Sequence, residues 1–416
     1  MKHFSLLFIV LLVCVLSISA QQHAVPGKIV YIGQDNNVYT YDLMAGERHI
    51  LTDDATPARV YQYPVWSNDG RLAYFCCDAT RTSQLQTQVY ISSDGIQAGE
   101  LVHQIPLSIF TYAYWAPRNC DTDASCRDLS ILVGGNEGFS LVFVRDLQTQ
   151  NTSQIIGQGA PFYYSWSPDA KQLITQRNQR QLDIYHIDQE TFQTIPLQPG
   201  FFSAPAWSPV DDRLLMGVLN PIDRTTDLVI YANDSTTTLV EGLAGSVAFS
   251  WSPDGNMIAY RTITRDKIGD LIVIDAITGE IITRTTNKEA LSFFWSPDSQ
   301  KIAFVTIAQP RGTFNISYPL QETPLSLLGW SVLDVTNGIA RAYSNFTPTA
   351  EMIYVLTYFD QFTQSHRIWS PDSTHIVFSE VLPNNQGNGI SILDTTRPDT
   401  VPFFIAEGVI GFWSFN

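Results

Sequence analysis

One short phrase recurs along this chain of 416 residues: an apolar run that ends in Trp and is followed by Ser-Pro-Asp-Gly or a variant of it. Successive copies lie 49, 51, 41, 44, 44, 74 and 44 residues apart. A period of roughly 40 to 50 residues is typical of propellers and solenoids. Eight of the nine tryptophans occupy this position: Trp66, Trp115, Trp166, Trp207, Trp251, Trp295, Trp369 and Trp413.

Each repeat predicts four short strands. The run into Trp forms the first strand, and Ser-Pro-Asp-Gly forms a tight turn, because Pro presets φ, Asp bonds to nearby amides and Gly tolerates positive φ. A second strand follows at once, as in Arg71 to Phe75, and a short fourth strand closes the unit. The third strand ends in Asp in eight places, which is an independent count: Asp42, Asp94, Asp146, Asp188, Asp234, Asp275, Asp334 and Asp394.

The two ends of the chain are complementary. Residues 28–32, 38–42 and 48–52 supply a second, third and fourth strand without a Trp strand ahead of them, and the chain stops just after Trp413. One blade built from both termini would close the ring and protect its last edge. We therefore predict an all-β, eight-bladed β-propeller of four-stranded antiparallel blades. It would occupy residues 21–416 as a single domain, with the C-terminal strand paired to the N-terminal strands.

The repeat resembles the WD-like repeats of TolB-type β-propellers. The likeness rests on Trp-Ser-Pro-Asp-Gly with the strand after it and on the aliphatic-Tyr-x-x-Asp strand, and it covers residues 28–416. That group also includes the propeller domains of tricorn-like and prolyl-oligopeptidase-like enzymes and an oligogalacturonate lyase. The chain lacks the α/β domain that precedes the propeller of TolB and counts eight blades instead of six, so it is not TolB itself. The shared residues are turn and packing residues, so the resemblance implies a fold and not a function.

The first twenty residues have the three regions of a secretory signal peptide. Lys2 precedes an apolar stretch from Leu6 to Leu16, and small residues lead to Ala20, after which we expect cleavage. Cys14 leaves lipid anchoring open as an alternative, although the residue before it is Val13 and not a small one. No later segment is long and apolar enough to cross a membrane. The sequence therefore predicts a secreted protein, extracellular or periplasmic.

The formal net charge is −16, in a chain with 44% hydrophobic residues. So acidic a surface repels phosphate backbones, which makes nucleic acid a poor candidate partner. The expected partner is a protein, peptide or glycan, and the expected state is a monomer.

Four cysteines remain after cleavage. Cys120 and Cys126 bracket a polar hairpin, and in an oxidising compartment we expect a disulfide between them. Cys76 and Cys77 are adjacent, and successive strand side chains point to opposite faces. They are interpreted as two packing residues, with a strained vicinal disulfide as the open alternative.

Catalytic and metal motifs are missing from the sequence. Aspartates recur at equal spacing in the turns, which would suit calcium, but Asp after Pro in a tight turn bonds to backbone amides. Asp121 to Ser125 resembles the start of a calcium loop and lacks its later Gly and Glu. No Gly-x-Ser-x-Gly, Cys-x-x-Cys or His-Glu-x-x-His is found. We predict no catalytic residue, no metal site and no cofactor.

One blade carries two long connections. Trp295 to Asp334 takes 39 residues where other blades need 22 to 31, and Asp334 to Trp369 takes 35 where others need 17 to 24. Strand alternation places both connections on one face, which is the candidate binding surface. Alternatively, the inserted aromatics form a small local core under a long loop. The candidate ligand-binding residues are Arg311, Tyr318, Tyr358, Phe359, Asp360 and His366.

Three functions fit these observations. The first is a non-catalytic binding scaffold for a protein, peptide or glycan. The second is a carbohydrate-active enzyme, a polysaccharide lyase or hydrolase, that works over the mouth of the channel; it requires acidic and basic groups that converge near the axis. The third is a purely structural role in the envelope, without a ligand.

Overall fold

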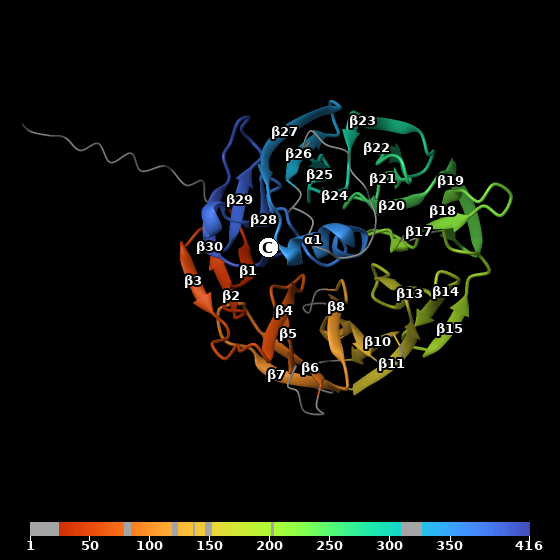
Figure 1. Cartoon of the computed structure of the whole chain (residues 1–416). Coiled ribbons are helices and arrows are strands. Elements are labelled where there is room, and N and C mark those ends of the chain that lie inside the picture. Colours follow the sequence, from red (N-terminus) through yellow and green to blue (C-terminus); the bar gives the residue numbers. More distant parts are fainter. Residues whose placement is uncertain are drawn as a thin grey trace, which may run out of the picture.

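Eight antiparallel sheets stand around a common axis like the blades of a wheel (Figure 1). The computed structural model describes residues 25–78, 85–118, 124–135, 138–145, 152–200, 204–308 and 327–416. The predicted eight-bladed propeller is confirmed. The expected signal peptide, residues 1–20, lies outside the described residues.

We number the blades by the order of their tryptophans, and each blade is given from the axis to the rim. Blades 1 and 2 contain β4 (Arg59–Trp66), β5 (Leu72–Asp78), β6 (Gln86–Ser92) and β7 (Glu100–Pro106), then β8 (Ile109–Trp115), β9 (Leu129–Gly135), β10 (Gly138–Arg145) and β11 (Thr152–Gly159). Blades 3 and 4 contain β12 (Phe162–Trp166), β13 (Gln172–Arg177), β14 (Gln181–His186) and β15 (Thr191–Thr194), then β16 (Ala206–Trp207), β17 (Leu214–Leu219), β18 (Thr226–Ala232) and β19 (Ser235–Leu243).

The remaining blades follow the same plan with one exception. Blades 5 and 6 contain β20 (Ser246–Trp251), β21 (Met257–Ile263), β22 (Asp270–Asp275) and β23 (Ile281–Glu289), then β24 (Ser292–Trp295), β25 (Lys301–Ile307), β26 (Leu328–Asp334) and β27 (Ile339–Phe346). Blade 7 has the three strands β28 (His375–Val381), β29 (Asn388–Asp394) and β30 (Phe403–Glu407). Blade 8 contains β31 (Ile410–Trp413), β1 (Lys28–Ile32), β2 (Val38–Asp42) and β3 (Glu47–Ile50).

Blade 8 closes the ring from both ends of the chain. Its inner strand β31 pairs antiparallel with β1, in a register that sets Trp413 opposite Ile29. The amide of Lys28 also donates to Ser414 Oγ at 2.9 Å. The predicted closure is confirmed. Because β31 and β1 pair with each other, neither strand leaves an open edge where the two ends of the chain meet.

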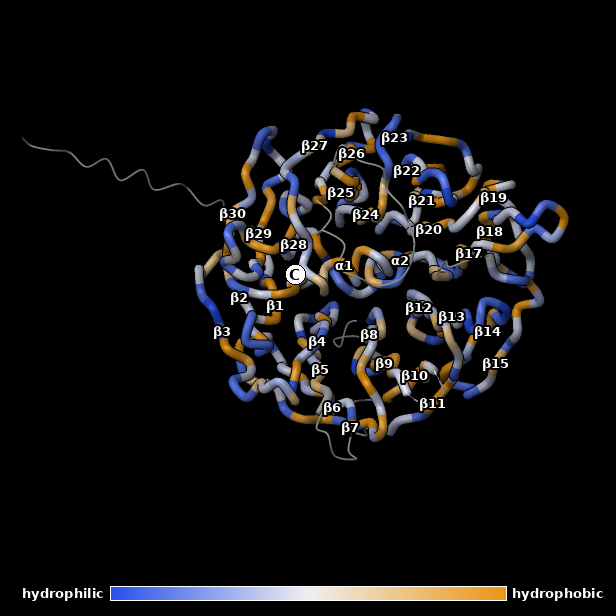
Figure 2. The backbone as a smooth tube through the Cα atoms, in the orientation of Figure 1, coloured by the Kyte–Doolittle hydropathy of each residue, from blue (hydrophilic) through white to orange (hydrophobic). Residues whose placement is uncertain are grey.

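Blade 7 lacks a regular inner strand. In its place Trp369 forms a single bridge with Ile376. The chain between β27 and Trp369 instead forms α1 (Ala350–Thr357) and α2 (Phe359–Phe362), which lie at the centre of the ring (Figure 2). Two short 3-10 helices, η1 (Ala124–Arg127) and η2 (Pro383–Asn385), lie in other connections.

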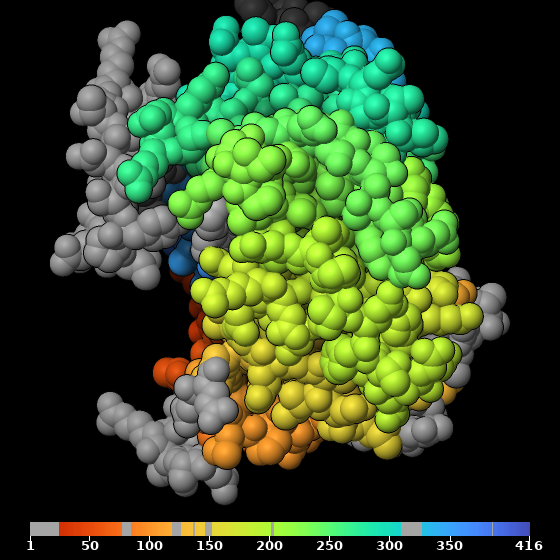
Figure 3. Space-filling view, turned by 90° about the vertical axis from the view of Figure 1, so that its right-hand side faces the viewer, coloured from red at the N-terminus to blue at the C-terminus, as the bar shows by residue number. Residues whose placement is uncertain are grey.

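Burial falls from the inner strands to the rim. All five residues of β12 are buried, whereas most residues of the rim strand β19 are exposed. Inner strands are covered on both faces by the neighbouring blades, and a rim strand has wider gaps on each side because the blades diverge. Seen edge-on, the blades between β11 and β23 follow one another around the wheel in sequence order (Figure 3).

The turn aspartates stabilise the turns, as the sequence indicated. Asp254 Oδ1 accepts from Ser252 Oγ at 2.6 Å and from the amide of Asn256 at 3.2 Å. Burial by itself would raise the pKa of Asp254, but these hydrogen bonds outweigh it and lower the pKa. Gly255 follows with φ of 71°, the left-handed conformation that favours glycine.

The repeat tryptophans join neighbouring blades. In four blades the indole N–H donates to the carbonyl of the residue that precedes the tryptophan of the blade before. These bonds are Trp115 to Val65 at 3.2 Å, Trp166 to Tyr114 at 3.1 Å, Trp251 to Ala206 at 2.9 Å and Trp369 to Phe294 at 2.9 Å. Among the described residues, the other four indole nitrogens have no partner: Trp66, Trp207, Trp295 and Trp413.

Arginines that directly precede the second strands cover some of these rings. Arg71 lies over Trp115 at 4.7 Å, and Arg213 lies over Trp251 at 4.9 Å. Each cation belongs to the blade before its tryptophan, so it adds a cation–π contact across the same blade boundary.

None of the helices in the described ranges has the length and apolarity that a bilayer crossing requires.

A pair of matched substitutions tests the role of the indole bonds. Trp166 Nε1 donates to Tyr114 and, at 2.9 Å, to Ser130 Oγ, whereas Trp207 Nε1 has no partner. Trp166→Phe should therefore lower the free energy of unfolding by about 1 kcal/mol more than Trp207→Phe, since both lose the same volume. Urea denaturation followed by circular dichroism measures this difference. Equal losses would show that the inter-blade hydrogen bonds contribute nothing.

Candidate functional site

The segment 347–368 fills the axis of the ring, and we call it the axial plug. The hydroxyl of Thr349 accepts from the amide of Met352 at 3.1 Å and so caps α1, the first helix of the plug. Met352, Val355 and Leu356 lie on one face of α1 and are buried. This spacing of three and four residues is that of a helix with one buried face.

Gln361 joins the plug to blade 3. Its side-chain Oε1 accepts from the amide of Tyr164 at 3.0 Å, and its Nε2 donates to the carbonyl of Tyr164 at 2.8 Å. The inner strand of a blade has one edge that faces the axis, where backbone groups lack a strand partner. The Gln361 amide supplies both missing hydrogen bonds, as a neighbouring strand would.

Asp360 joins the plug to blades 4 and 5. One carboxylate oxygen accepts from the amide of Ala204 at 3.0 Å, and the other accepts from the amide of Gln361 at 3.1 Å. Burial raises the pKa of Asp360, while the charge of Arg261 opposes this shift. Arg261 is itself buried, and burial lowers its pKa to about 10. It therefore stays protonated at neutral pH beside the carboxyl group.

A chain of three side chains joins the plug to blade 2. Ser365 Oγ lies 2.6 Å from the hydroxyl of Tyr112 and 2.7 Å from His366 Nδ1. The Tyr112 hydroxyl also lies 3.0 Å from the carbonyl of Gln361, to which it can donate. Burial lowers the pKa of His366 to about 3, so the imidazole is neutral at neutral pH.

Aromatic rings complete the contact with the ring of blades. Phe359 packs on Phe293 of blade 6 with ring centroids 4.7 Å apart, and His366 packs on Phe412 of blade 8 at 4.6 Å. Phe362 packs on Tyr63 of blade 1 at 5.6 Å. Together with its polar contacts, the plug thus touches the seven other blades.

One side of the plug is open to solvent on the face of the long connections. Ile353 and Tyr358 are 43% and 38% exposed there. Tyr354 packs between Tyr358 and Tyr63, with centroid distances of 4.9 and 5.5 Å. We call this surface the plug-face patch, made of Tyr63, Ile353, Tyr354, Thr357 and Tyr358.

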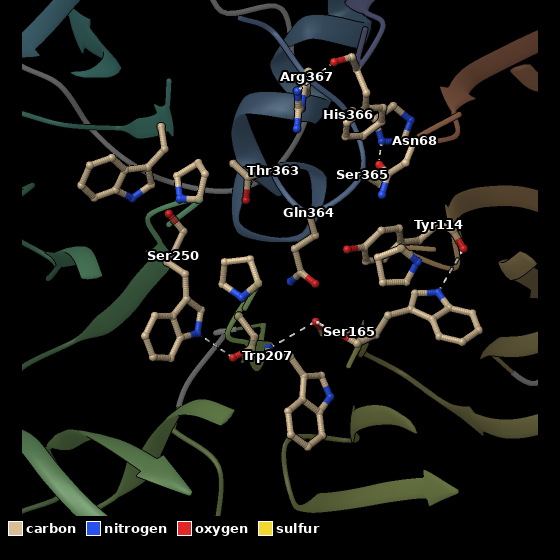
Figure 4. A pocket seen from close by; sticks show the side chains of 18 of the residues that line it. Asn68, Tyr114, Ser165, Trp207, Ser250, Thr363, Gln364, Ser365, His366 and Arg367 are labelled. Carbon is tan, nitrogen blue, oxygen red and sulfur yellow. Dashed lines mark hydrogen bonds between the residues drawn. The ribbon is translucent and has the colours of Figure 1, made fainter. Parts of the chain in front are cut away.

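The other side of the plug borders a cavity of about 310 Å³ on the face of the Trp-Ser-Pro turns. Figure 4 shows the Gln364 side chain projecting into this space below Thr363, while Arg367 lines the cavity farther along the plug, near His366. The plug lines the cavity from one end, and Trp, Ser and Pro residues of the turns line its sides. No residue of α1 lines it, so the cavity and the plug-face patch lie on opposite sides of the plug.

The structure separates the candidate binding residues of the sequence analysis. Tyr358 is exposed on the plug-face patch, whereas Phe359, Asp360 and His366 are buried. The buried aromatics form a core under the connection, which was one of the two alternatives. Binding at Tyr358 stays a prediction. Arg311 and Tyr318 lie outside the described residues.

The pairing of Cys120 with Cys126 stays a prediction. Cys126 is disulfide-bonded, and Cys120 lies outside the described residues. Cys76 is buried and not in a disulfide, as expected for a packing residue, and its Sγ lies 3.8 Å from Gln88 Oε1. Across the described residues, no group of three or more His, Cys, Asp and Glu side chains could hold a metal ion.

Sequence reasoning missed the two helices of the plug. Met352, Val355, Leu356, Phe359 and Phe362 recur at helical spacing after Thr349, a residue type that caps helices. This signal was available. The sequence interpretation rests on the aromatic content of this segment and leaves out the helical spacing of its apolar residues.

Comparisons with known proteins agree on the fold and leave the function open. Neither models of protein families nor curated proteins match this sequence. Among solved structures, it is similar to the dihydro-heme d1 dehydrogenase NirN in complex with DHE. The TM-score is 0.58 and the identity 11%, over 95% of this chain and 76% of the other.

Two further solved structures match the groups that the repeat resembles. An oligogalacturonate lyase in complex with manganese has a TM-score of 0.52 and 13% identity, over 89% of this chain and 98% of the other. TolB from Acinetobacter baumannii has a TM-score of 0.41 and 14% identity, over 86% of this chain and 83% of the other. At these identities the similarity shows the fold alone.

Removing the Gln361 amide tests whether the plug is part of the folded core. Gln361→Ala leaves the buried amide and carbonyl of Tyr164 without partners. The free energy of unfolding should fall by roughly 2 to 3 kcal/mol. Gln364→Ala is the matched control, because Gln364 Oε1 has no partner among the described residues and Nε2 makes only a 3.3 Å bond to the carbonyl of Asp360. Urea denaturation of both variants gives the comparison, and a cost for Gln361→Ala no larger than that of the control would contradict this role.

Proposed function

We propose that this protein is an exported propeller that binds a protein, peptide or glycan through the plug-face patch and catalyses no reaction. The observation that carries the proposal is the patch itself. It presents Ile353 and Tyr358 to solvent, on a helix whose opposite face is buried in the ring. Aromatic and aliphatic side chains on a rigid support are typical of the residues that dominate binding energies.

Contacts between aromatic rings hold the residues of the patch in place. Tyr354 packs against Tyr63, and Phe362 beneath them packs against both rings, at 5.9 and 5.6 Å. A preformed surface loses little conformational entropy when it binds. This favours recognition by the patch as it stands.

The enzymatic alternative has less support at this face. It requires acidic and basic groups that converge at the mouth of the channel, but α1 and α2 occupy that place. The polar side chains of α2, Asp360 and Gln361, are engaged with the backbone of Ala204 and Tyr164. These groups are used to hold the plug, which leaves them poorly placed to contact a polymer outside it.

Matched aspartate substitutions test the binding surface. Ile353→Asp places a charge in the patch, while Ile277→Asp places one on another exposed isoleucine, in the hairpin between β22 and β23. We expect Ile353→Asp and Tyr358→Ala to weaken binding of a captured partner by about tenfold or more. Ile277→Asp should bind like the wild type.

The measurement has two steps. Affinity capture from surface extracts with quantitative mass spectrometry finds the partner, and titration of the purified partner gives the dissociation constants. A partner that binds both Ile353→Asp and Tyr358→Ala as tightly as the wild type would exclude this surface.

Export is proposed on the pattern of Met1 to Ala20, and a disulfide at Cys126 suits an oxidising compartment. Expression in the native cell should yield a mature protein that begins at Gln21, in the medium or the periplasm. Fractionation followed by N-terminal mass spectrometry checks this. An uncleaved chain in the cytoplasm would contradict it.

A further inference from the structure

The cavity on the turn face has the size and walls of a small-molecule site. Its volume of about 310 Å³ is at the lower end of the range for ligand pockets, roughly 300 to 1,000 Å³. Its sides are formed by side chains that the turns hold in place. These include Trp115, Trp166, Trp251, Pro168, Pro253 and Pro297.

One cation lines this cavity. Arg367 packs its guanidinium on the ring of Phe415 at 4.2 Å, and Nη1 makes only a long hydrogen bond of 3.4 Å to the carbonyl of Phe415. Within the described ranges no carboxylate forms an ion pair with Arg367. Burial lowers its pKa to about 10, so it remains charged at neutral pH. A largely buried charge of this kind is stabilised by an anion beside it.

The carboxyl group that lines the cavity, that of Asp360, does not pair with Arg367. Asp360 also lines the cavity, but its oxygens accept from the amides of Ala204 and Gln361, and its electrostatic partner is Arg261. The positive charge of Arg367 is thus left for a group that the chain itself does not supply.

Polar atoms without partners lie in the same cavity. Ser250 is 8% exposed, and neither its Oγ nor Gln364 Oε1 has a hydrogen-bond partner among the described residues. Gln364 Nε2 makes only a 3.3 Å bond to the carbonyl of Asp360. The amide points into the cavity, and Ser250 lines the cavity from the wall across from it (Figure 4). Such buried atoms are costly unless a bound molecule satisfies them.

We propose that this cavity binds a small hydroxy acid of about the size of a monosaccharide. The carboxylate pairs with Arg367, and hydroxyl groups of the ligand bond to Gln364 Oε1 and Ser250 Oγ. Pro and Trp rings contact its apolar faces. This site lies on the side of the plug opposite the plug-face patch, so it does not depend on the partner proposed there.

Two pairs of compounds isolate the carboxylate. D-glucuronate and D-glucose differ at one carbon, as do D-gluconate and D-sorbitol, and in each pair only the first is an anion at neutral pH. Isothermal titration calorimetry of the full mature chain should show binding of at least one of the two acids, about tenfold or more tighter than its neutral counterpart. Added salt should weaken the binding, because the pair is electrostatic.

Three variants assign the binding to this cavity. Arg367→Met removes the cation, and Gln364→Glu keeps Arg367 but places a competing carboxylate in the cavity. Both should lose about tenfold or more in affinity for the acid. Arg224→Met is the control, because Arg224 is exposed in a loop outside the cavity and should bind like the wild type.

The outcomes decide the proposal. Gln364→Glu keeps the test valid if Arg367→Met fails to fold, which circular dichroism shows. The proposal is overturned if neither acid binds, if each neutral compound binds as tightly as its acid, or if Gln364→Glu binds the acid unchanged. Loss of partner capture by the plug-face patch variants, with acid binding intact, would leave this site standing.

Discussion

The inner edges of the blades are the constraint on which this structure depends. The first strands of the blades would leave backbone N–H and C=O groups without partners along an open axis. A segment of the same chain, the axial plug, fills the axis and bonds to some of these groups. The Gln361 amide bonds both backbone groups of Tyr164, and Asp360 accepts the amide of Ala204. Because these bonds and the contacts of Phe359, Phe362, Ser365 and His366 reach the other seven blades, the plug fixes the centre of the wheel. Blade 7 gives up its regular inner strand for this purpose.

The repeat and the plug act at different radii. The indole bonds, such as that of Trp251 to Ala206, join four of the blades, each to the one before it, near the turn face. The plug connects blades that are not neighbours in sequence. It also divides the axis into two surfaces: an exposed aromatic patch on one side, and a cavity with an unpaired cation on the other. Both proposed functions follow from that division, and they use different side chains.

The fold could be predicted because its signals are local and repeated. Trp followed by Ser-Pro-Asp or a variant of it marks the turns, and aspartates at the ends of third strands accept bonds from their own hairpins, as Asp275 does from the amide of Ile277 at 2.9 Å. The site could be predicted only in part. The helical period from Met352 to Phe362 was legible, but the partners of Gln361 lie 197 residues away. Likewise Ser250 lines the same cavity as Gln364 and Arg367 only because the ring of blades is closed. No pattern in the sequence shows that these residues share a cavity.

The most direct test of this account is hydrogen exchange at the amide of Tyr164, followed by NMR in the native state. This N–H faces the axis, and its partner is the side chain of Gln361. If the plug is part of the folded core, this amide exchanges only with global unfolding, as slowly as the amides inside blade 3. Rapid exchange at Tyr164, while its strand neighbours stay protected, would show that the axis is open and would contradict the account.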